Sequence, residues 1–92
     1  MSTVTVALDG ELDFATAFDV EMRLERAIRD ADQVVIDLSG LDFIDSTGIG
    51  TLLEAHQAAR REGVELRLLP GRERVQRVFE MAGLLDELPF AA

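Results

Sequence analysis

The hydrophobic pattern of this chain changes repeatedly between the spacing of a strand and the spacing of a helix. Val4, Val6 and Leu8 alternate with polar or small residues, which is typical of a strand. Other segments place apolar residues three or four positions apart, which is typical of an amphipathic helix. The predicted strands and helices alternate along the chain, in the order 3–8, 16–31, 33–38, 47–62, 64–69 and 72–82.

This alternation predicts an α/β fold, because strands joined by helical crossovers pair in parallel through right-handed connections. A chain of 92 residues is expected to form one domain, residues 1–92, with the order β-α-β-α-β-α-(β). The last, short strand falls near residues 85–90, where Pro89 limits it to an edge or a terminus. We therefore expect a small, mostly parallel sheet with helices packed against it. The nearly continuous apolar run at 33–38 predicts a strand that is buried on both faces.

Glycine and polar residues mark where these elements are expected to end. Asp9-Gly10 and Gly40 follow the first two predicted strands and are expected to close them. Gly63 stands where a helix commonly ends on a left-handed residue. Thr16 stands where a side chain caps the start of a helix.

Charge and composition exclude several classes of function. The chain has 18 acidic residues against nine Arg, a formal charge of −9, so neither a nucleic acid nor an anionic membrane is an expected partner. With no Cys and one His, it has no donor set for a His/Cys metal site, and no metal or cofactor is expected. No apolar run approaches the ~18 residues of a membrane span, and the N-terminus lacks a signal-peptide pattern. The cytoplasm is the expected location.

The segment 41–50, Leu-Asp-Phe-Ile-Asp-Ser-Thr-Gly-Ile-Gly, carries the candidate site. It lies between a predicted strand and a predicted helix, at the end of the sheet where parallel folds bind ligands. Gly48 and Gly50 each cost a helix roughly 1 kcal/mol relative to Ala, which indicates that something approaches this backbone closely. Ser46 falls at or beside the helix N-cap, and capping is the ordinary role of a Ser in that position.

The alternative interpretation is that Ser46 accepts a phosphoryl group. A phosphate adds about −1.5 to −2 charge, and a helix N-terminus stabilises such a group by roughly 0.3–1 kcal/mol. Phosphorylation would then leave the domain folded, while making its surface bulkier and more negative beside Asp45.

Several motifs together point to one family. Gly10-Glu11-Leu12-Asp13 leads into the first helix, and Val35-Ile36-Asp37-Leu38 precedes Asp45-Ser46-Thr47-Gly48. Ala82-Gly83-Leu84 follows near the end of the last helix. In this order and spacing, the motifs resemble those of the anti-sigma factor antagonists of the STAS domain family, over nearly the whole chain.

The resemblance implies a phosphorylation-switched binding protein and not an enzyme, with no catalytic residues. In that family, an anti-sigma factor that is an ATP-dependent serine kinase phosphorylates the Ser after the motif's Asp. The unphosphorylated form binds this anti-sigma factor and frees the bacterial sigma factor, phosphorylation ends the binding, and a serine phosphatase restores it. Carried over by position, the acceptor is Ser46, and the partner-binding residues are Asp13, Asp45, Ser46, Thr47, Gly48 and Gly50.

The chain differs from the family's usual pattern at its two ends. Members commonly have one more strand before the one at residues 3–8, and one more helix after the last strand. The exposed strand edge is therefore expected to be open to pairing. The oligomeric state stays open, as does whether the chain is complete or part of a longer protein.

The residues support a hydrolase or a nucleotide-binding protein less well. A hydrolase needs a base for Ser46, and the one His, His56, lies ten residues further along the same helix, roughly 15 Å away. We expect His56 to be packed or half-buried instead. A nucleotide site of the G-x-x-x-x-G-K-[ST] type is absent from the sequence. A constitutive accessory or scaffold subunit remains an alternative, because STAS domains also serve in lipid-transport complexes, transporters and stress-signalling assemblies.

Overall fold

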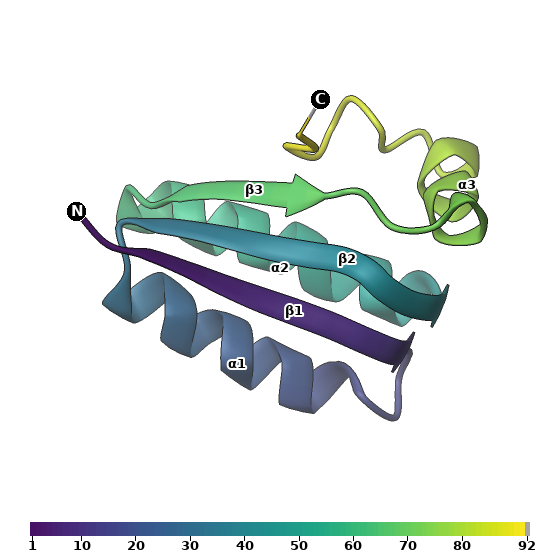
Figure 1. The fold of residues 1–92 in the computed structure, drawn as a ribbon, viewed down its shortest axis with the longest axis horizontal. Coiled ribbons are helices and arrows are strands. Elements are labelled where there is room, and N and C mark those ends of the chain that lie inside the picture. The colour runs from purple at the N-terminus through teal and green to yellow at the C-terminus, as the bar shows by residue number, and fades with distance from the viewer. Residues whose placement is uncertain (92) are drawn as a thin grey trace.

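Strands and helices alternate along the chain in the computed structural model, which describes residues 1–91 (Figure 1). The strands are β1 (Thr3–Leu12), β2 (Gln33–Ile44) and β3 (Glu65–Leu69). The helices are α1 (Ala17–Asp30), α2 (Ser46–Glu62) and α3 (Glu73–Met81). The predicted α/β fold and the predicted order of its first six elements are confirmed.

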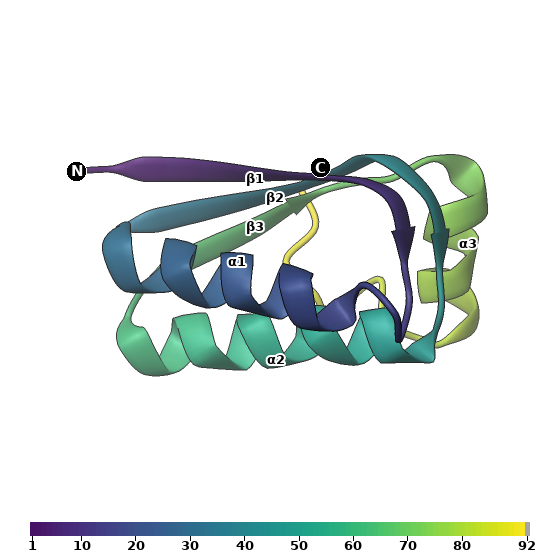
Figure 2. The same cartoon turned by 90° about the horizontal axis from the view of Figure 1, so that it is seen from below.

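The sheet is parallel throughout, in the order β1-β2-β3, with Val4 opposite Val34 and Ile36 opposite Leu68. Both α1 and α2 lie on the same face of this sheet (Figure 2). Two right-handed crossovers that advance in the same direction across a sheet pass over the same face. No helix of residues 1–91 covers the opposite face.

The one-sided packing changes the burial of β2. Val34, Ile36 and Leu38 are fully buried, whereas Val35 and Asp37, which alternate with them, are only half-buried. The prediction that residues 33–38 form a strand buried on both faces is therefore wrong. A continuous apolar run does not reveal on which side of the sheet its crossover helices lie, and here both helices lie on one side.

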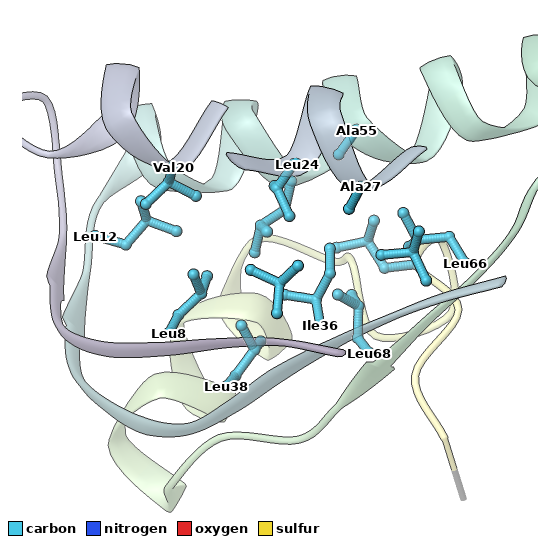
Figure 3. Close-up of a cluster of buried hydrophobic side chains, with 14 of the residues drawn as sticks. Leu8, Leu12, Val20, Leu24, Ala27, Ile36, Leu38, Ala55, Leu66 and Leu68 are labelled. Carbon is cyan, nitrogen blue, oxygen red and sulfur yellow. The ribbon is translucent and has the colours of Figure 1, made fainter. Parts of the chain in front are cut away.

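The core fills the space between the sheet and the two helices. In Figure 3, leucine and isoleucine side chains of the strands point toward Val20, Leu24 and Ala27 of α1 and Ala55 of α2. Burying one such side chain completely contributes roughly 1.5–3 kcal/mol. The strand residues labelled there are Leu8, Leu12, Ile36, Leu38, Leu66 and Leu68.

Two strands run further than their turn signals suggest. Asp9-Gly10 lies inside β1, which ends at Leu12, and Gly40 lies inside β2, which ends at Ile44. The predicted strand ends at these glycines are wrong. By contrast, Gly63 has φ of +70° and ends α2, as predicted, with its N–H bonded to the last carbonyls of the helix.

The glycines allow both strands to bend instead of ending them. Gly10 has φ of +70°, and the pairing of β1 with β2 is irregular on either side of it. A Cβ on Gly40 would lie 2.9 Å from the Leu8 carbonyl oxygen, so the two backbones approach too closely for a side chain there. Beyond this region β1 and β2 curve together toward the start of α2 (Figure 2).

The final strand predicted near residues 85–90 is reduced to one isolated parallel bridge between Leu68 and Phe90. The Leu68 N–H donates to the Pro89 carbonyl at 3.0 Å, and the Ala91 N–H donates to the Leu68 carbonyl at 2.8 Å. The Phe90 ring packs edge-on against Phe79 of α3, with 5.1 Å between the ring centroids. This segment therefore occupies part of the outer edge of β3, and β1 forms the other edge of the sheet.

None of the helices within residues 1–91 is long and apolar enough to cross a membrane.

Candidate functional site

The candidate site lies where β1 and β2 end side by side. Leu12 and Ile44 are the last paired residues of these strands, and the Asp45 N–H donates to the Leu12 carbonyl at 3.2 Å. The loop that begins at Asp13 and the start of α2 at Ser46 therefore leave the sheet from adjacent positions. The structure thus brings together the two parts of the chain that the motifs singled out.

Asp45, and not Ser46, caps the start of α2. The Asp45 Oδ1 accepts a hydrogen bond from the Gly48 N–H at 3.0 Å, and its carbonyl accepts one from the Ile49 N–H at 3.0 Å. Ser46 is the first residue of the helix, and no hydrogen bond engages its hydroxyl within residues 1–91. The interpretation of Ser46 as a helix cap is wrong, because the carboxylate next to it occupies that role.

Ser46 and Thr47 are both exposed in the first turn of α2. A helix start carries a partial positive charge, and its first N–H groups have no partner inside the helix. The Gly48 N–H already donates to the Asp45 carboxylate. The buried Thr51 hydroxyl donates to the Thr47 carbonyl at 3.2 Å. The exposed hydroxyl of Ser46 therefore lies at a place that tolerates an added anion.

The two glycines of this turn have different surroundings. A Cβ on Gly48 would lie 2.5 Å from the Leu12 carbonyl oxygen and 2.9 Å from the Ile44 side chain. The close approach expected of the glycines is therefore found at Gly48, where the approaching group is the end of β1. A Cβ on Gly50 would meet no atom within 4 Å, so packing inside the chain does not require glycine there.

Asp13 organises the loop that precedes α1. Its Oδ1 accepts from the Ala15 N–H at 2.9 Å and from the Thr16 N–H at 3.2 Å, and its carbonyl accepts from the Ala17 N–H at 2.8 Å. The Thr16 hydroxyl donates instead to the Glu11 carbonyl at 2.8 Å, so the predicted side-chain cap by Thr16 is wrong. The carboxylate of Asp13 thus has a structural role, whatever else it contacts.

Large apolar side chains are exposed beside this site. Phe14 is 80% exposed in the turn after Asp13, and Phe18, one turn along the start of α1, is 68% exposed. Met22 follows a further turn along α1 at 44%. Phe18 and Met22 lie off the buried stripe of α1, so helical spacing alone marks them as exposed, whereas no spacing in the sequence marks Phe14. We refer to Phe14, Phe18 and Met22 as the apolar stripe.

The one histidine of the chain lies far from Ser46 along α2. His56 is half-buried, as expected, and lies on the same helix ten residues beyond Ser46. A straight helix separates such positions by roughly 15 Å, well outside hydrogen-bond reach. Within residues 1–91, no group of three His, Cys, Asp or Glu side chains is arranged to hold a metal ion.

Comparison with known proteins agrees with the motifs. The STAS domain profile matches residues 2–92. The anti-sigma F factor antagonist of Paenibacillus polymyxa is 34% identical over 86 residues, a span of 91% of this chain and 74% of that protein.

Three solved structures have the same fold. The anti-sigma factor antagonist SpoIIAA in its unphosphorylated form superposes with a TM-score of 0.79 at 26% identity, covering 99% of this chain and 81% of that one. The phosphorylated form of SpoIIAA from Bacillus gives 0.71 at 25% identity, covering 98% and 83%. An anti-sigma factor antagonist from Mycobacterium paratuberculosis gives 0.83 at 27% identity, covering 95% and 75%. The chain therefore belongs to the STAS domain family and, within it, to the anti-sigma factor antagonists.

Proposed function

We propose that this chain is a binding module switched by phosphorylation of Ser46. In the unphosphorylated form it binds an anti-sigma factor that is also a serine kinase, and the sigma factor is released. The kinase then phosphorylates Ser46, which ends the binding, and a serine phosphatase returns the chain to its binding form. The proposal places the chain in the cytoplasm, where sigma factors act.

The observation that carries this proposal is the state of the Ser46 hydroxyl. Ser46 is exposed on the first turn of α2. Asp45, and not Ser46, makes the hydrogen bond that caps this helix. A kinase therefore meets a hydroxyl that need not break an internal hydrogen bond before it reacts. Solved structures of SpoIIAA in both a phosphorylated and an unphosphorylated form support a phosphorylation switch in this chain too.

The chemistry asks little of the chain itself. The Ser46 Oγ forms a bond to the γ-phosphorus of ATP while the bond from that phosphorus to ADP breaks, and the hydroxyl proton passes to a base of the kinase. In the reverse half of the cycle, water attacks the phosphorus and the Ser46 oxygen leaves with a proton. ATP and both catalytic bases belong to the partner enzymes, so the chain needs only an accessible acceptor.

A phosphate at Ser46 alters binding more than folding. The N–H groups of the first turn of α2 favour an added anion by roughly 0.3–1 kcal/mol. The same phosphate adds about −1.5 to −2 charge beside Asp45. A partner surface that fits the neutral hydroxyl has no room for the phosphate and no group to pair with its charge. Each 1.4 kcal/mol of binding free energy lost in this way lowers the affinity tenfold.

The partner-binding surface of this proposal surrounds Ser46. Asp13 and Asp45 supply charge at its border, and Thr47 and Gly50 offer an exposed and an open position on α2. Gly48 acts indirectly, because it lets the end of β1 approach the helix and so sets the position of Ser46. The apolar stripe continues this surface along α1 and supplies the desolvated contact area that holds most interfaces together.

The test uses the chain with a purified cognate anti-sigma factor kinase and ATP. We expect a mass gain of one phosphate, located at Ser46, followed by dissociation of the complex. Ser46→Ala should abolish the mass gain and keep the binding, while Ser46→Asp should weaken binding at least tenfold. Ser39→Ala is the matched control, since it removes an exposed hydroxyl of β2 outside the proposed surface and should leave the single phosphorylation intact.

Two outcomes count against the switch. Binding of the Ser46→Asp variant as tight as that of the parent chain contradicts it directly. A stable complex that ignores both ATP and every Ser46 substitution is the behaviour of a constitutive scaffold subunit, and would establish that alternative instead.

A further inference from the structure

We propose that the groove between α1 and α2 is a docking site for a basic amphipathic helix of another protein. The two helices are formed within residues 17–62, so the groove itself does not depend on either end of the chain. Its first residue on α2, Thr51, lies more than one turn beyond Ser46, so the site is separate from the proposed phosphoswitch. Three features support it, namely the shape of the groove, the acidic side chains on its rims and a buried hydroxyl in its wall.

Two adjoining hollows lie between α1 and α2, which run side by side in the same direction on one face of the sheet (Figure 2). Their volumes are about 80 Å³ and about 250 Å³, and both are lined by Glu25, Ile28 and Ala58. Because they share these residues, they form one continuous depression, which we call the interhelical groove. Leu24, Ile28 and Ala55 are buried and form its apolar floor. The small side chains of Ala55 and Ala58 leave room on the α2 side for the side chains of a third helix.

Acidic side chains line both rims of the interhelical groove. Glu21 and Glu25 lie one turn apart on α1, and Glu54 and Glu62 lie about two turns apart on α2. All four are exposed, and none belongs to the three ion pairs within residues 1–91. Like charges one turn apart on a helix repel each other. A cation in the groove therefore relieves a repulsion that the free chain leaves uncompensated.

The arginines at the groove do not cancel this acidity. Four glutamates face two arginines, Arg29 and Arg61, and both arginines lie in the last turn of their helices. A cation in that position is attracted to the negative end of its own helix. The net charge of −9 adds a long-range attraction for a basic partner and repels an acidic one. The local and the overall charge thus favour the same class of occupant.

A buried hydroxyl supplies a hydrogen-bond acceptor in the wall of the interhelical groove. Thr51 is only 8% exposed and lines the groove together with Glu21 and Glu54. Its hydroxyl donates to the Thr47 carbonyl at 3.2 Å and accepts no hydrogen bond from residues 1–91. Arg and Lys side chains carry donors and no acceptor. The unused acceptor of Thr51 therefore fits the same basic side chains that the glutamates attract.

The spacing of the rims fits a helix. Glu54 and Glu62 are separated by eight residues of one helix, roughly 12 Å at 1.5 Å per residue. A helix laid along the groove directs apolar residues, three or four positions apart, onto the floor and flanking residues toward the two rims. The apolar stems of Arg or Lys at the flanking positions cover the floor, while their charged ends reach the carboxylates.

The test uses residues 1–92 labelled with ¹⁵N and two blocked peptides of about 15 residues, long enough to form a helix. Both peptides have Leu and Ala on one helical face. In the first, Arg residues flank that face, and in the second, Glu replaces each Arg. We expect the Arg peptide to shift the amide signals of Glu25, Ile28 and Ala58, and to bind at least about tenfold more tightly than the Glu peptide.

Two charge reversals on α1 separate the groove from the general attraction of an acidic protein. Glu25→Arg should lower the affinity for the Arg peptide at least about fivefold. Asp30→Arg changes the net charge equally on the same helix, but Asp30 lines neither hollow. This control should change the affinity less than about twofold. Equal losses in the two variants, or equal binding of the two peptides, would overturn the proposal.

A third variant tests the groove as a space. Ala58→Leu fills the groove without changing any charge, and we expect it to lower the affinity at least about tenfold while thermal unfolding shows that the fold persists. Unchanged binding, or shifts confined to other surfaces, would contradict docking in the groove. Shifts of the same amides that grow with protein concentration alone would do so too, because they would identify a second copy as the occupant. Neither a kinase nor phosphorylation of Ser46 enters this experiment, so its failure would not count against the proposed switch.

Discussion

At the scale of single residues, the start of α2 shows how neighbouring side chains divide roles that the sequence leaves ambiguous. Asp45 caps the helix and Ser46 stays unbonded within the described chain, although both residue types are good caps. Gly48 is required by a carbonyl of β1, whereas Gly50 is surrounded by open space. Each assignment depends on an atom from another part of the chain.

The two glycines should respond oppositely to the same substitution. Gly48→Ala forces a methyl group against the Leu12 backbone and should lower the free energy of unfolding by about 1–3 kcal/mol. Gly50→Ala meets no atom and replaces a poor helix former, so it should raise the free energy of unfolding by roughly 0.5–1 kcal/mol. Urea unfolding measures both, and a stabilised Gly48→Ala variant would contradict the packing described here.

The cap assignment predicts a second contrast. Asp45→Ala removes the acceptor of the Gly48 N–H and should cost about 1 kcal/mol of stability. Ser46→Ala removes only an exposed, unbonded hydroxyl and should change stability by less than ~0.5 kcal/mol. The two variants compared in one denaturant series decide which residue is the cap. If Ser46→Ala proved the more costly, the assignment would be reversed.

At the scale of elements, α1 uses two of its sides. One side buries Val20, Leu24 and Ile28 against the sheet and α2, and another exposes Phe18 and Met22. An exposed aromatic contributes little to folding, because it gains nothing from burial in the free chain. Its energetic effect, if it contacts a partner, is realised only in the complex.

Substitutions in the apolar stripe should therefore separate binding from stability. Phe18→Ser should leave the free energy of unfolding within ~0.5 kcal/mol of the parent value and weaken kinase binding at least about tenfold. Met81→Ser is a matched control, because Met81 is 82% exposed at the end of α3 and outside the proposed interface. Titration calorimetry with the kinase measures the effect, and equal affinities for both variants would remove the stripe from the interface.

At the scale of the whole molecule, repulsion among acidic residues outweighs the ion pairs. The three ion pairs within residues 1–91, Glu65–Arg67, Asp42–Arg72 and Glu73–Arg77, all involve side chains more than half exposed. Such pairs contribute about 0–1 kcal/mol each at most. The net charge of −9 acts across the entire surface and favours the expanded, unfolded chain.

Added salt should consequently stabilise the fold. Raising NaCl from about 10 mM to about 150 mM shortens the screening length from about 30 Å to about 8 Å. At pH 7 we expect the Tm to rise by about 2–5 °C. The stability gained by screening the repulsion should exceed the stability lost by weakening the three ion pairs. Thermal unfolding followed by circular dichroism measures this, and a Tm that falls with salt would mean that the ion pairs dominate.

Local spacing was sufficient to predict the three helices, the existence of the three sheet strands, their order and their parallel pairing, but not where β1 and β2 end. The spacing of apolar residues a few positions apart indicates an amphipathic helix or a strand, as Val4, Val6 and Leu8 do. The motif around Ser46 likewise identified the candidate site, because its residues are contiguous. These properties depend on neighbours in the chain, so the sequence by itself determined them.

Only the tertiary structure decided the properties that depend on which distant segments meet. Gly10 and Gly40 were predicted to end their strands, whereas they lie where the paired strands bend. Such a bend depends on both strands together, so the sequence of one strand does not reveal it. The open face of the sheet follows from both crossovers taking the same side, which no residue of β2 encodes alone. The choice of Asp45 as cap and the need for glycine at Gly48 each arise where two elements come together. Local periodicity contains no information on which distant segments come into contact. The packing of the folded chain decides these contacts.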